Sequence, residues 1–452
     1  MNILKLFVVS LAATIALKAA DAPLRIAVFK ADATPPLGSP VAYAPARSIT
    51  DPLSARGVVL LGDGKPVVLC AVDWIGIGNS GHDEWRKGLA EAAGTTMDRV
   101  AVHTLHQHDG ARCDFSAEEL LAAHGLGGTR FDVDFCRKTI AGTAAAIREA
   151  LTKARHITHL GVGEAKVEKV ASNRRIIGPL GKLILGRMSA SKNPDAQAAP
   201  EGTIDPVLKL VSFWDGETPL ACMTYYATHP QSFYGKGDVT AEFVGLARAQ
   251  RENALNLPHI HFNGASGNVA AGKYNDGSPE ARVVLTQHMA DGMQRAWEAT
   301  RKTRITSNDL DWRVHAVALP LGAHLVRETL QATLADEKAD PRNRLNAATK
   351  LAYLTRHQNG HQIEISRLKL GSVSILHMPG ELFVEYQLAA QQMRPDETVC
   401  MAAYGDYGTG YIGTEIAYSQ GGYEIQPSSS NTAPEVEQVL MDAMRKLLSE
   451  AP

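Results

Sequence analysis

Three histidines lie within six residues of one another, at His103, His106 and His108. They follow the apolar run 100–102, which is typical of a β-strand. In extended chain His106 and His108 point to the same side, and two imidazoles on one face can share a metal ion or a substrate. The alternative is a cluster of hydrogen-bonded histidines on a turn. The spacing predicts a candidate metal site whose remaining ligands come from elsewhere in the chain.

Two further polar residues stand just beyond apolar, β-rich runs. His229 follows the run 219–226, and Glu381 follows the run 373–376 and the turn at Pro379 and Gly380. Strand ends are good places for a site because rigid backbone fixes the side chains there. Each residue also has an ordinary structural explanation, since a lone histidine often only packs and Glu381 could compensate a helix dipole. Both residues are therefore candidates for the same site.

Two glycine-containing segments add possible partners. The segment 261–269 includes Gly267 and Asn268, and such small residues can present backbone N–H groups to an oxyanion. The segment 404–411 combines glycines with three tyrosines, of which Tyr411 is the last. A phenol can bind a metal or donate a hydrogen bond to an oxyanion. A tight turn in the first segment and plain packing of the tyrosines are the alternatives.

Three stretches of the chain echo one another, and each is typical of a β-hairpin. Each has two β-rich runs around a glycine-containing turn. The paired runs are 57–61 with 66–72, 210–214 with 219–226, and 363–370 with 373–376. The second runs lead to Asp73, His229 and Glu381, so hairpins are expected to position these polar residues.

Helical patterns fall between the hairpins. The expected helices are 131–154, 240–255, 278–301, 381–393 and 434–448, with two more in 325–356 separated near Pro341. Weakly ordered loops are expected at 178–202 and 421–433, which are rich in Gly, Ser, Pro or Ala. Interleaved strands and helices predict an α/β (α+β layered) fold, with mixed sheets built from hairpins and flanking helices in one large catalytic domain.

The composition is that of an ordinary globular chain. The 452 residues include 46 Lys and Arg and 48 Asp and Glu, which gives a formal charge of −2. Phosphate binding needs a surplus of cationic residues, so nucleic acid is not expected as a partner. The five cysteines form no CxxC pair, which argues against a cysteine zinc site. In an exported protein Cys113 and Cys136 could form a disulfide.

The N-terminus resembles a secretory signal peptide. A short basic start precedes a mostly apolar stretch and then small residues, so residues 1–22 are expected to be removed. The protein would then be periplasmic or secreted, with the domain at 23–452. An uncleaved amphipathic anchor is the alternative reading of residues 1–22. No later segment is apolar enough to cross a membrane, so the mature chain is expected to lack a transmembrane anchor.

Taken in order, these motifs resemble the catalytic N-terminal domain of the neutral (non-lysosomal) ceramidase family. The matching segments keep the family's order from about residue 25 to the C-terminus. They are Asp32 to Gly38, Leu105 to Gly110, Ser172 to Arg174, Tyr226 to Ser232, Ser266 to Val269, Pro379 to Glu381, Tyr411 to Glu415, and Gly422 to Glu424.

The resemblance implies a Zn²⁺ site made by His106, His229, Glu381 and Tyr411. It also implies that His108 moves protons or contacts the oxyanion, that Arg174 binds polar groups of the substrate, and that Tyr411 helps to hold the metal or the oxyanion. Gly267 and Asn268 are expected to contact the substrate. Zinc-activated water would attack the carbonyl of an N-acyl amide, ceramide-like or related, in a small-molecule or lipid-like substrate.

The chain departs from the family pattern in two respects. Ala270 stands where family members carry a serine, so any role of that hydroxyl is lost, whereas a mechanism using metal-activated water survives. The usual C-terminal immunoglobulin-like domain is expected to be absent. Two alternatives therefore stay open: a non-catalytic relative that binds a lipid or glycan at the old site, and a metal-dependent phosphoesterase with Arg174 on the phosphate.

Overall fold

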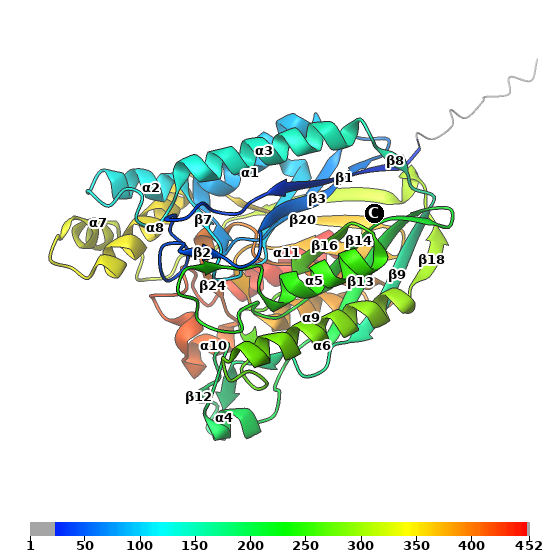
Figure 1. The fold of residues 1–452 in the computed structure, drawn as a ribbon. Coiled ribbons are helices and arrows are strands. Elements are labelled where there is room, and N and C mark those ends of the chain that lie inside the picture. The colour runs from blue at the N-terminus through cyan, green and yellow to red at the C-terminus, as the bar shows by residue number, and fades with distance from the viewer. Residues whose placement is uncertain (1–22, 450–452) are drawn as a thin grey trace, which may run out of the picture.

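Three large mixed β-sheets organise the part of the chain that the computed structural model describes, residues 23–449 (Figure 1). The first sheet has the order β6-β4-β3-β1-β8, the second β16-β14-β13-β9-β18, and the third β19-β20-β21-β23. The strands are β1 (Arg25–Asp32), β3 (Ser54–Leu61), β4 (Val67–Val72), β6 (Val100–Thr104), β8 (Arg155–His156), β9 (His159–Lys166), β13 (Val207–Asp215), β14 (Thr218–Tyr226), β16 (His259–Asn263), β18 (Arg301–Arg304), β19 (Leu310–Val317), β20 (Ile363–Leu370), β21 (Val373–His377) and β23 (Thr398–Ala402).

The same topology is repeated in all three sheets. An antiparallel strand leads into an antiparallel hairpin, and the second hairpin strand then pairs in parallel with a later strand: β4 with β6, β14 with β16, and β21 with β23. A crossover helix joins each parallel pair, as parallel pairing requires. These helices are α1 (Asn79–Ala93), α5 (Glu242–Leu255) and α9 (Val384–Met393).

A second helix follows each parallel pair and packs against the crossover helix or the sheet. These helices are α3 (Val133–Leu151), α6 (Pro279–Glu298) and α11 (Val436–Leu448). In Figure 1, α1 and α3 lie over the sheet of β1 and β3, whereas α5 and α6 lie over that of β9 and β13. Each repeat is therefore a sheet with one face covered by two helices.

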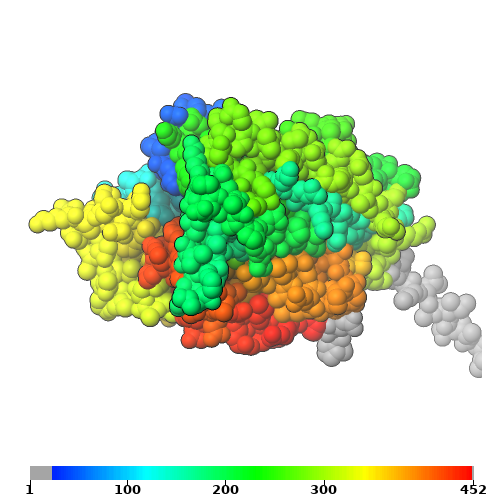
Figure 2. All heavy atoms as spheres, turned by 90° about the horizontal axis from the view of Figure 1, so that it is seen from below, coloured from blue at the N-terminus to red at the C-terminus, as the bar shows by residue number. Residues whose placement is uncertain are grey.

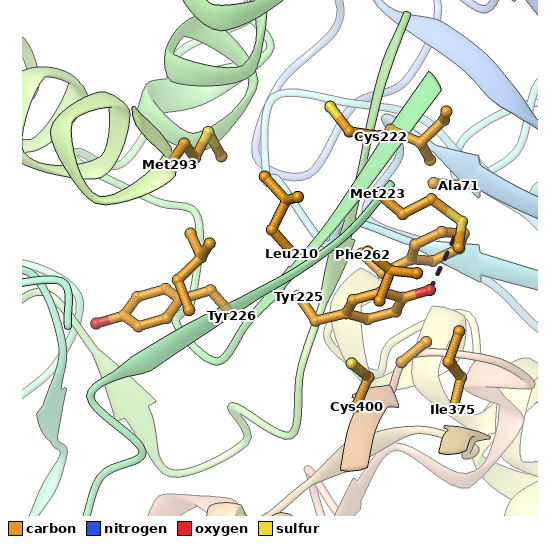
Figure 3. Close-up of a cluster of buried hydrophobic side chains, with 14 of the residues drawn as sticks. Ala71, Leu210, Cys222, Met223, Tyr225, Tyr226, Phe262, Met293, Ile375 and Cys400 are labelled. Atoms are coloured by element: carbon orange, nitrogen blue, oxygen red, sulfur yellow. Dashed lines mark hydrogen bonds between the residues drawn. The ribbon is translucent and has the colours of Figure 1, made fainter. Parts of the chain in front are cut away.

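The uncovered faces of the sheets meet in a common core. Every residue of β4, β6, β16 and β21 is buried, as expected for parallel pairs covered on both faces. Figure 3 shows Tyr225 of β14 beside Phe262 of β16, with Ile375 of β21 and Cys400 of β23 close by and Ala71 of β4 at the edge. Hydrogen bonds also join the sheets, since Thr104 N–H donates to Tyr404 O and Ala403 N–H donates to Asn263 O, each at 3.0 Å.

Smaller elements surround this core. They are α2 (Phe115–Ala122), α4 (Pro194–Ala198), α7 (Arg327–Ala335), α8 (Pro341–Gln358), α10 (Glu415–Gln420), short 3-10 turns at Met97–Arg99, Ser307–Asp309, Tyr407–Thr409 and Tyr423–Ile425, and the short strands β2 (Ser48–Ile49), β5 (Gly76–Ile77), β7 (Arg112–Cys113), β10 (Ser172–Asn173), β11 (Arg175–Ile177), β12 (Leu183–Gly186), β15 (Asp238–Val239), β17 (Val269–Ala270), β22 (Glu381–Leu382) and β24 (Tyr411–Ile412). In Figure 2 the segment around β11 and β12 forms a ridge beside the orange and red C-terminal segments, and α7 and α8 project at one end.

The α/β fold expected from the sequence is confirmed, as are the three hairpins and the division of a helical pair before Pro341. Helices α1 and α2 were missed, and three expectations about the elements were wrong in detail. Glu381 lies in β22 and not at the start of a helix, because α9 begins only at Val384. The segment 178–202 contains β12 and α4, and the segment 421–433 contains a 3-10 turn.

The cysteines are all buried free thiols, so the structure does not contain the disulfide considered for Cys113 and Cys136. The expected signal peptide, residues 1–22, lies outside the described residues. Within residues 23–449, no helix combines the length and apolarity that crossing a bilayer would require.

A buried ion pair ties the first sheet to the second repeat. Arg248 of α5 donates from Nη1 and Nη2 to the two carboxylate oxygens of Asp73, at 2.6 and 2.7 Å. Burial by itself would raise the pKa of Asp73, but Arg248 holds it below its ordinary value. The stabilisation is thus present above the ordinary Asp pKa and is lost as the pH falls through the lower pKa of the folded state.

We expect Asp73→Ala to lower the free energy of unfolding by about 3–5 kcal/mol, because it leaves the Arg248 charge buried and unpaired. Urea denaturation measures the change. The exposed Asp98 provides the matched control, and Asp98→Ala should change the free energy of unfolding by no more than about 0.5 kcal/mol. Equal effects of the two substitutions would contradict the assignment of Asp73–Arg248 as a stabilising pair.

Candidate metal centre

Four residues from separate parts of the chain converge where the three sheets meet. His106 follows β6 and His229 follows β14, whereas Glu381 and Tyr411 lie opposite each other in the parallel pair β22 and β24. Glu381 Oε2 lies 3.1 Å from His106 Nε2 and 3.2 Å from His229 Nε2. The Tyr411 hydroxyl lies 3.3 Å from His229 Nε2. The structure therefore brings together all four residues that the sequence suggested as ligands.

Backbone carbonyls fix the orientation of both imidazoles. His106 Nδ1 lies 2.7 Å from Ile75 O, and His229 Nδ1 lies 2.7 Å from Ser266 O. A carbonyl can only accept, so Nδ1 carries the proton in each ring. Burial lowers the pKa of His229 to about 4, although Glu381 opposes the shift. His229 is neutral at pH 7, and its Nε2 lone pair faces the carboxylate.

This arrangement is suited to a metal cation. The imidazole lone pair and the carboxylate oxygen both accept, and their close approach in a buried site is unfavourable unless a cation lies between them. Two imidazole nitrogens and a carboxylate oxygen form a common zinc donor set. The carbonyls on Nδ1 are the outer partners that hold such ligands in place. The donor chemistry therefore fits the implied metal.

His108 stands at the edge of this cluster. One nitrogen from each of His106, His108 and His229 lies within 4.8 Å of the other two, so the three histidines could also hold a metal together. His108 Nε2 is 3.2 Å from His106 Nε2, and His108 Nδ1 is 2.5 Å from the Tyr43 hydroxyl. Burial, followed by the neighbouring imidazoles, lowers the pKa of His108 well below its ordinary value. His108 is thus neutral at pH 7.

The backbone at His106 is in the left-handed region, with φ at +67°, so the chain from His106 to His108 is not extended as the sequence suggested. Such a conformation in a residue other than glycine costs of order 1–2 kcal/mol. Tyr404, with φ at +61°, stacks on the His106 ring at 4.6 Å between centroids. The Tyr404 hydroxyl is 2.7 Å from Ser266 Oγ. Packing and hydrogen bonding thus hold the strained histidine.

Arg174 lies directly against the centre. Its Nη1 donates to the Tyr411 hydroxyl at 3.0 Å, and its Nε is 3.5 Å from Glu424 Oε1. Burial would lower the pKa of Arg174, but Tyr411 and Glu424 raise it above its ordinary value. Burial raises the pKa of Tyr411 well above its ordinary value, although Arg174 opposes this shift. The guanidinium is therefore a fixed positive charge beside a protonated phenol.

The two residues expected to contact the substrate have other partners in the structure. A Cβ on Gly267 would lie 2.3 Å from Glu381 O, so a glycine is needed for this close approach. The Asn268 side chain accepts from Val384 N–H at 2.9 Å and donates to Glu385 at 2.8 Å. Their substrate contacts stay a prediction, whereas their observed contacts position β22 and the start of α9.

Two residues at the centre were not singled out from the sequence. Tyr407 donates its hydroxyl to Glu381 Oε1 at 2.6 Å, and it belongs to the glycine- and tyrosine-rich segment already noted. Tyr43 contacts His108, and Gln231 donates to the Tyr43 hydroxyl at 3.0 Å. No motif identifies Tyr43, because it reaches the centre from a loop far away in the sequence.

A cavity of about 640 Å³ opens onto this cluster. Glu381, Tyr407 and Tyr411 form part of its wall, together with Tyr43 and Tyr423. The cavity has room for a ligand beside the histidines and the carboxylate.

We expect His106→Ala and His229→Ala each to abolish tight metal binding, because each removes a nitrogen donor. Metal content after loading with Zn²⁺ and gel filtration measures the effect, and about one ion per chain is expected for the unmodified protein. The exposed His156 of β8 provides the control, and His156→Ala should keep the ion. Full metal content in both site variants would contradict the assignment.

We expect Tyr407→Phe to weaken metal affinity by about 10- to 100-fold, because the carboxylate loses the donor that orients it. Competition with a chromophoric chelator measures the affinity. The Tyr418 hydroxyl bonds to Thr432 O away from the centre, so Tyr418→Phe is the matched control. An unchanged affinity in Tyr407→Phe would show that the hydrogen bond does not orient the ligand.

Two solved structures share this fold. A structure described as a ceramidase complexed with C2 aligns with a TM-score of 0.68 and 16% identity, over 94% of this chain and 74% of that chain. A neutral ceramidase from Pseudomonas aeruginosa aligns with a TM-score of 0.66 and 17% identity, over 95% of this chain and 74% of that chain. No protein-family model and no curated protein matches the sequence. The chain therefore has the ceramidase-like fold, with a buried histidine cluster at its centre that could hold a metal.

Proposed function

We propose that this protein is an exported zinc-dependent hydrolase that cleaves a linear N-acyl amide, ceramide-like or related. The observation that carries the proposal is the convergence of His106 Nε2, His229 Nε2 and Glu381 Oε2 beside a cavity. The fold shared with ceramidases supports amide hydrolysis, and the N-terminal sequence supports export. A carbonyl substrate would enter through the cavity.

His106, His229 and Glu381 would hold the zinc, which would supply Lewis acidity that lowers the pKa of a water to about 7 and polarises a carbonyl group. The protein supplies the other functions. His108 is neutral and has Tyr43 on its Nδ1, so its ring can take a proton from the attacking water and pass it to the leaving amine. Such proton transfer typically contributes about 10²- to 10⁴-fold in rate.

Arg174 and Tyr411 are placed to receive developing negative charge. The phenol is protonated and accepts from the guanidinium, so its own O–H can donate to the substrate oxygen. Donors fixed in this way act without reorganising during the reaction. The assignment needs no serine nucleophile, which is consistent with Ala270, whose methyl group is buried in β17 opposite Ser172.

A metal-dependent phosphoesterase is the second candidate, because a buried arginine stands within hydrogen-bond distance of the centre and could bind a phosphate oxygen. The non-catalytic relative, motivated by Ala270, would bind metal without turnover. One panel separates all three: matched N-acyl amides, carboxylic esters and phosphomonoesters, incubated with the zinc-loaded protein. Amide cleavage supports the proposal, release of phosphate alone favours the phosphoesterase, and no turnover favours the non-catalytic relative.

We expect His108→Gln to reduce kcat for amide cleavage by about 10²- to 10⁴-fold, since glutamine cannot transfer the proton. The zinc content should stay near one per chain. Rate assays and metal analysis on the same preparation provide both values. Loss of zinc in this variant would instead make His108 a ligand, and an unchanged rate would rule out its proposed role.

A further inference from the structure

The cavity beside the metal centre is strongly cationic. The described residues that line it include Arg112, Arg130, Arg342 and Lys350, whereas Glu381, which belongs to the centre itself, is their only carboxylate. The whole chain has a formal charge of −2. Positive charge is therefore concentrated in this cavity, although the net charge of the whole chain is negative. A positively charged cleft attracts a negatively charged ligand.

None of these four cations forms an ion pair with a described carboxylate, and Arg112 and Arg130 are the two that share a recess beside Tyr407. The Arg112 guanidinium makes no hydrogen bond or ion pair with any described residue, and its buried Nε has no partner. Arg130 donates from Nη1 to Asn346 Oδ1 at 3.0 Å, but its buried Nε is also unpartnered. Burial, followed by the Arg112 charge, lowers the pKa of Arg130 to about 9, although Tyr407 and Asp114 oppose the shift. The two guanidiniums repel each other, and neither forms an ion pair with Asp114, the carboxylate that lines their shared recess.

Several other arginines of this chain with little exposure pair with carboxylates. Arg248 pairs with Asp73, Arg175 with Glu424, and Arg356 with both Asp406 and Asp83. Arg187, which has no carboxylate, donates to several backbone carbonyls. Arg112 and Arg130 are partly buried, and an unpaired charge withdrawn from water is costly, so this pair of guanidiniums favours a ligand that supplies an anion.

Helix α8 extends the cationic wall. Arg342, Asn346 and Lys350 are spaced four residues apart and therefore share one face of the helix. All three line the cavity. Burial lowers the pKa of Lys350, and its Nζ donates to Pro427 O. The α8 face thus closes the side of the cavity on which Arg130 is held by Asn346.

A small recess lies between the two arginines and the centre. Its volume is about 20 Å³, and its wall includes Arg112, Arg130 and Tyr407. Asp114 also lines it, but the carboxylate of Asp114 accepts from Asn79, Ser116 and Ala117. Tyr407 in turn donates to Glu381. An oxyanion bound by the arginines would therefore lie one tyrosine away from the metal ligands.

We propose that Arg112 and Arg130 bind an oxyanionic group on the substrate, so that this protein acts on an anionic N-acyl amide, such as an N-acyl amino acid, in preference to a neutral one. This inference rests on the proposed amide hydrolysis. Guanidinium groups suit this role because they bind carboxylate and phosphate oxygens in bidentate fashion. The acyl amide then reaches from the arginine pair past Tyr407 to the centre.

Binding of non-hydrolysable ketone analogues to the zinc-loaded full-length protein tests the inference. The matched probes are 4-oxotridecanoic acid and its neutral carboxamide, with 3-oxododecylphosphonic acid as a second anion. Calorimetry should show the carboxylate binding about tenfold or more tightly than the carboxamide, as expected for a charge-assisted contact. A phosphonate that binds still more tightly than the carboxylate would identify a phosphate-type group as the natural anion.

Arg112→Gln and Arg130→Gln should each remove most of the preference for the carboxylate probe over the carboxamide probe. Arg304→Gln, at an exposed arginine of β18, should retain this preference. Equal affinity of the unmodified protein for acid and carboxamide would overturn the inference. A preference that survives in both cavity variants would overturn it too, because the carboxylate would then be bound by the metal alone. Thermal melting by circular dichroism establishes that the variants are folded.

The unmodified protein provides an independent measurement if a variant does not fold. Added salt should weaken the binding of the carboxylate probe but not that of the carboxamide probe, because salt screens the attraction between charges. The same salt response for both probes would overturn the inference. Failure of the proposed function would give a different result. Anion-selective binding without hydrolysis of N-decanoylglycine would overturn the proposed hydrolase activity. Equal kcat/KM for N-decanoylglycine and N-decanoylglycinamide would overturn the anion site.

Discussion

The centre of this protein depends on an interaction that is unfavourable without a cation. Glu381 Oε2 stands 3.1 and 3.2 Å from two imidazole nitrogens whose ring protons are committed to Ile75 O and Ser266 O. Each of these atoms can accept a hydrogen bond, and all of them are buried. The surrounding structure has to hold them together against this repulsion, and a divalent ion converts the repulsion into coordination.

Threefold repetition of one topology supplies that rigidity. Each sheet contains one parallel pair, and the candidate ligands lie beyond the carboxyl ends of these pairs. His106 follows β6, His229 follows β14 and Glu381 follows β21. Polar residues gather at such strand ends in open α/β sheets. Hydrogen bonds from Thr104 to Tyr404 and from Ala403 to Asn263 lock the three ends to one another. The sheets therefore fix the candidate ligands together with connecting segments that supply Ile75 O and Ser266 O.

Much of this could be predicted from the sequence. The hairpins were recognisable because their period and turn residues are local signals, and His106, His229 and Glu381 were recognisable because they follow such strands. Helix α1 was missed, because it has a polar mean composition and begins within a glycine-containing segment. Tyr43 and the unpaired Arg112 and Arg130 could not be found, since their meaning comes from contacts between distant parts of the chain. The left-handed backbone at His106 follows from tertiary packing that overrides local preference.

The distribution of donors over three repeats has a consequence for the integrity of the site. No contiguous fragment smaller than the span from His106 to Glu381 contains both histidines and the carboxylate. A proteolytic nick that releases one repeat would therefore leave an incomplete donor set, however well the remaining sheets stayed folded. Metal binding at this site would consequently require the whole assembled chain, and incomplete products of synthesis or degradation would lack it.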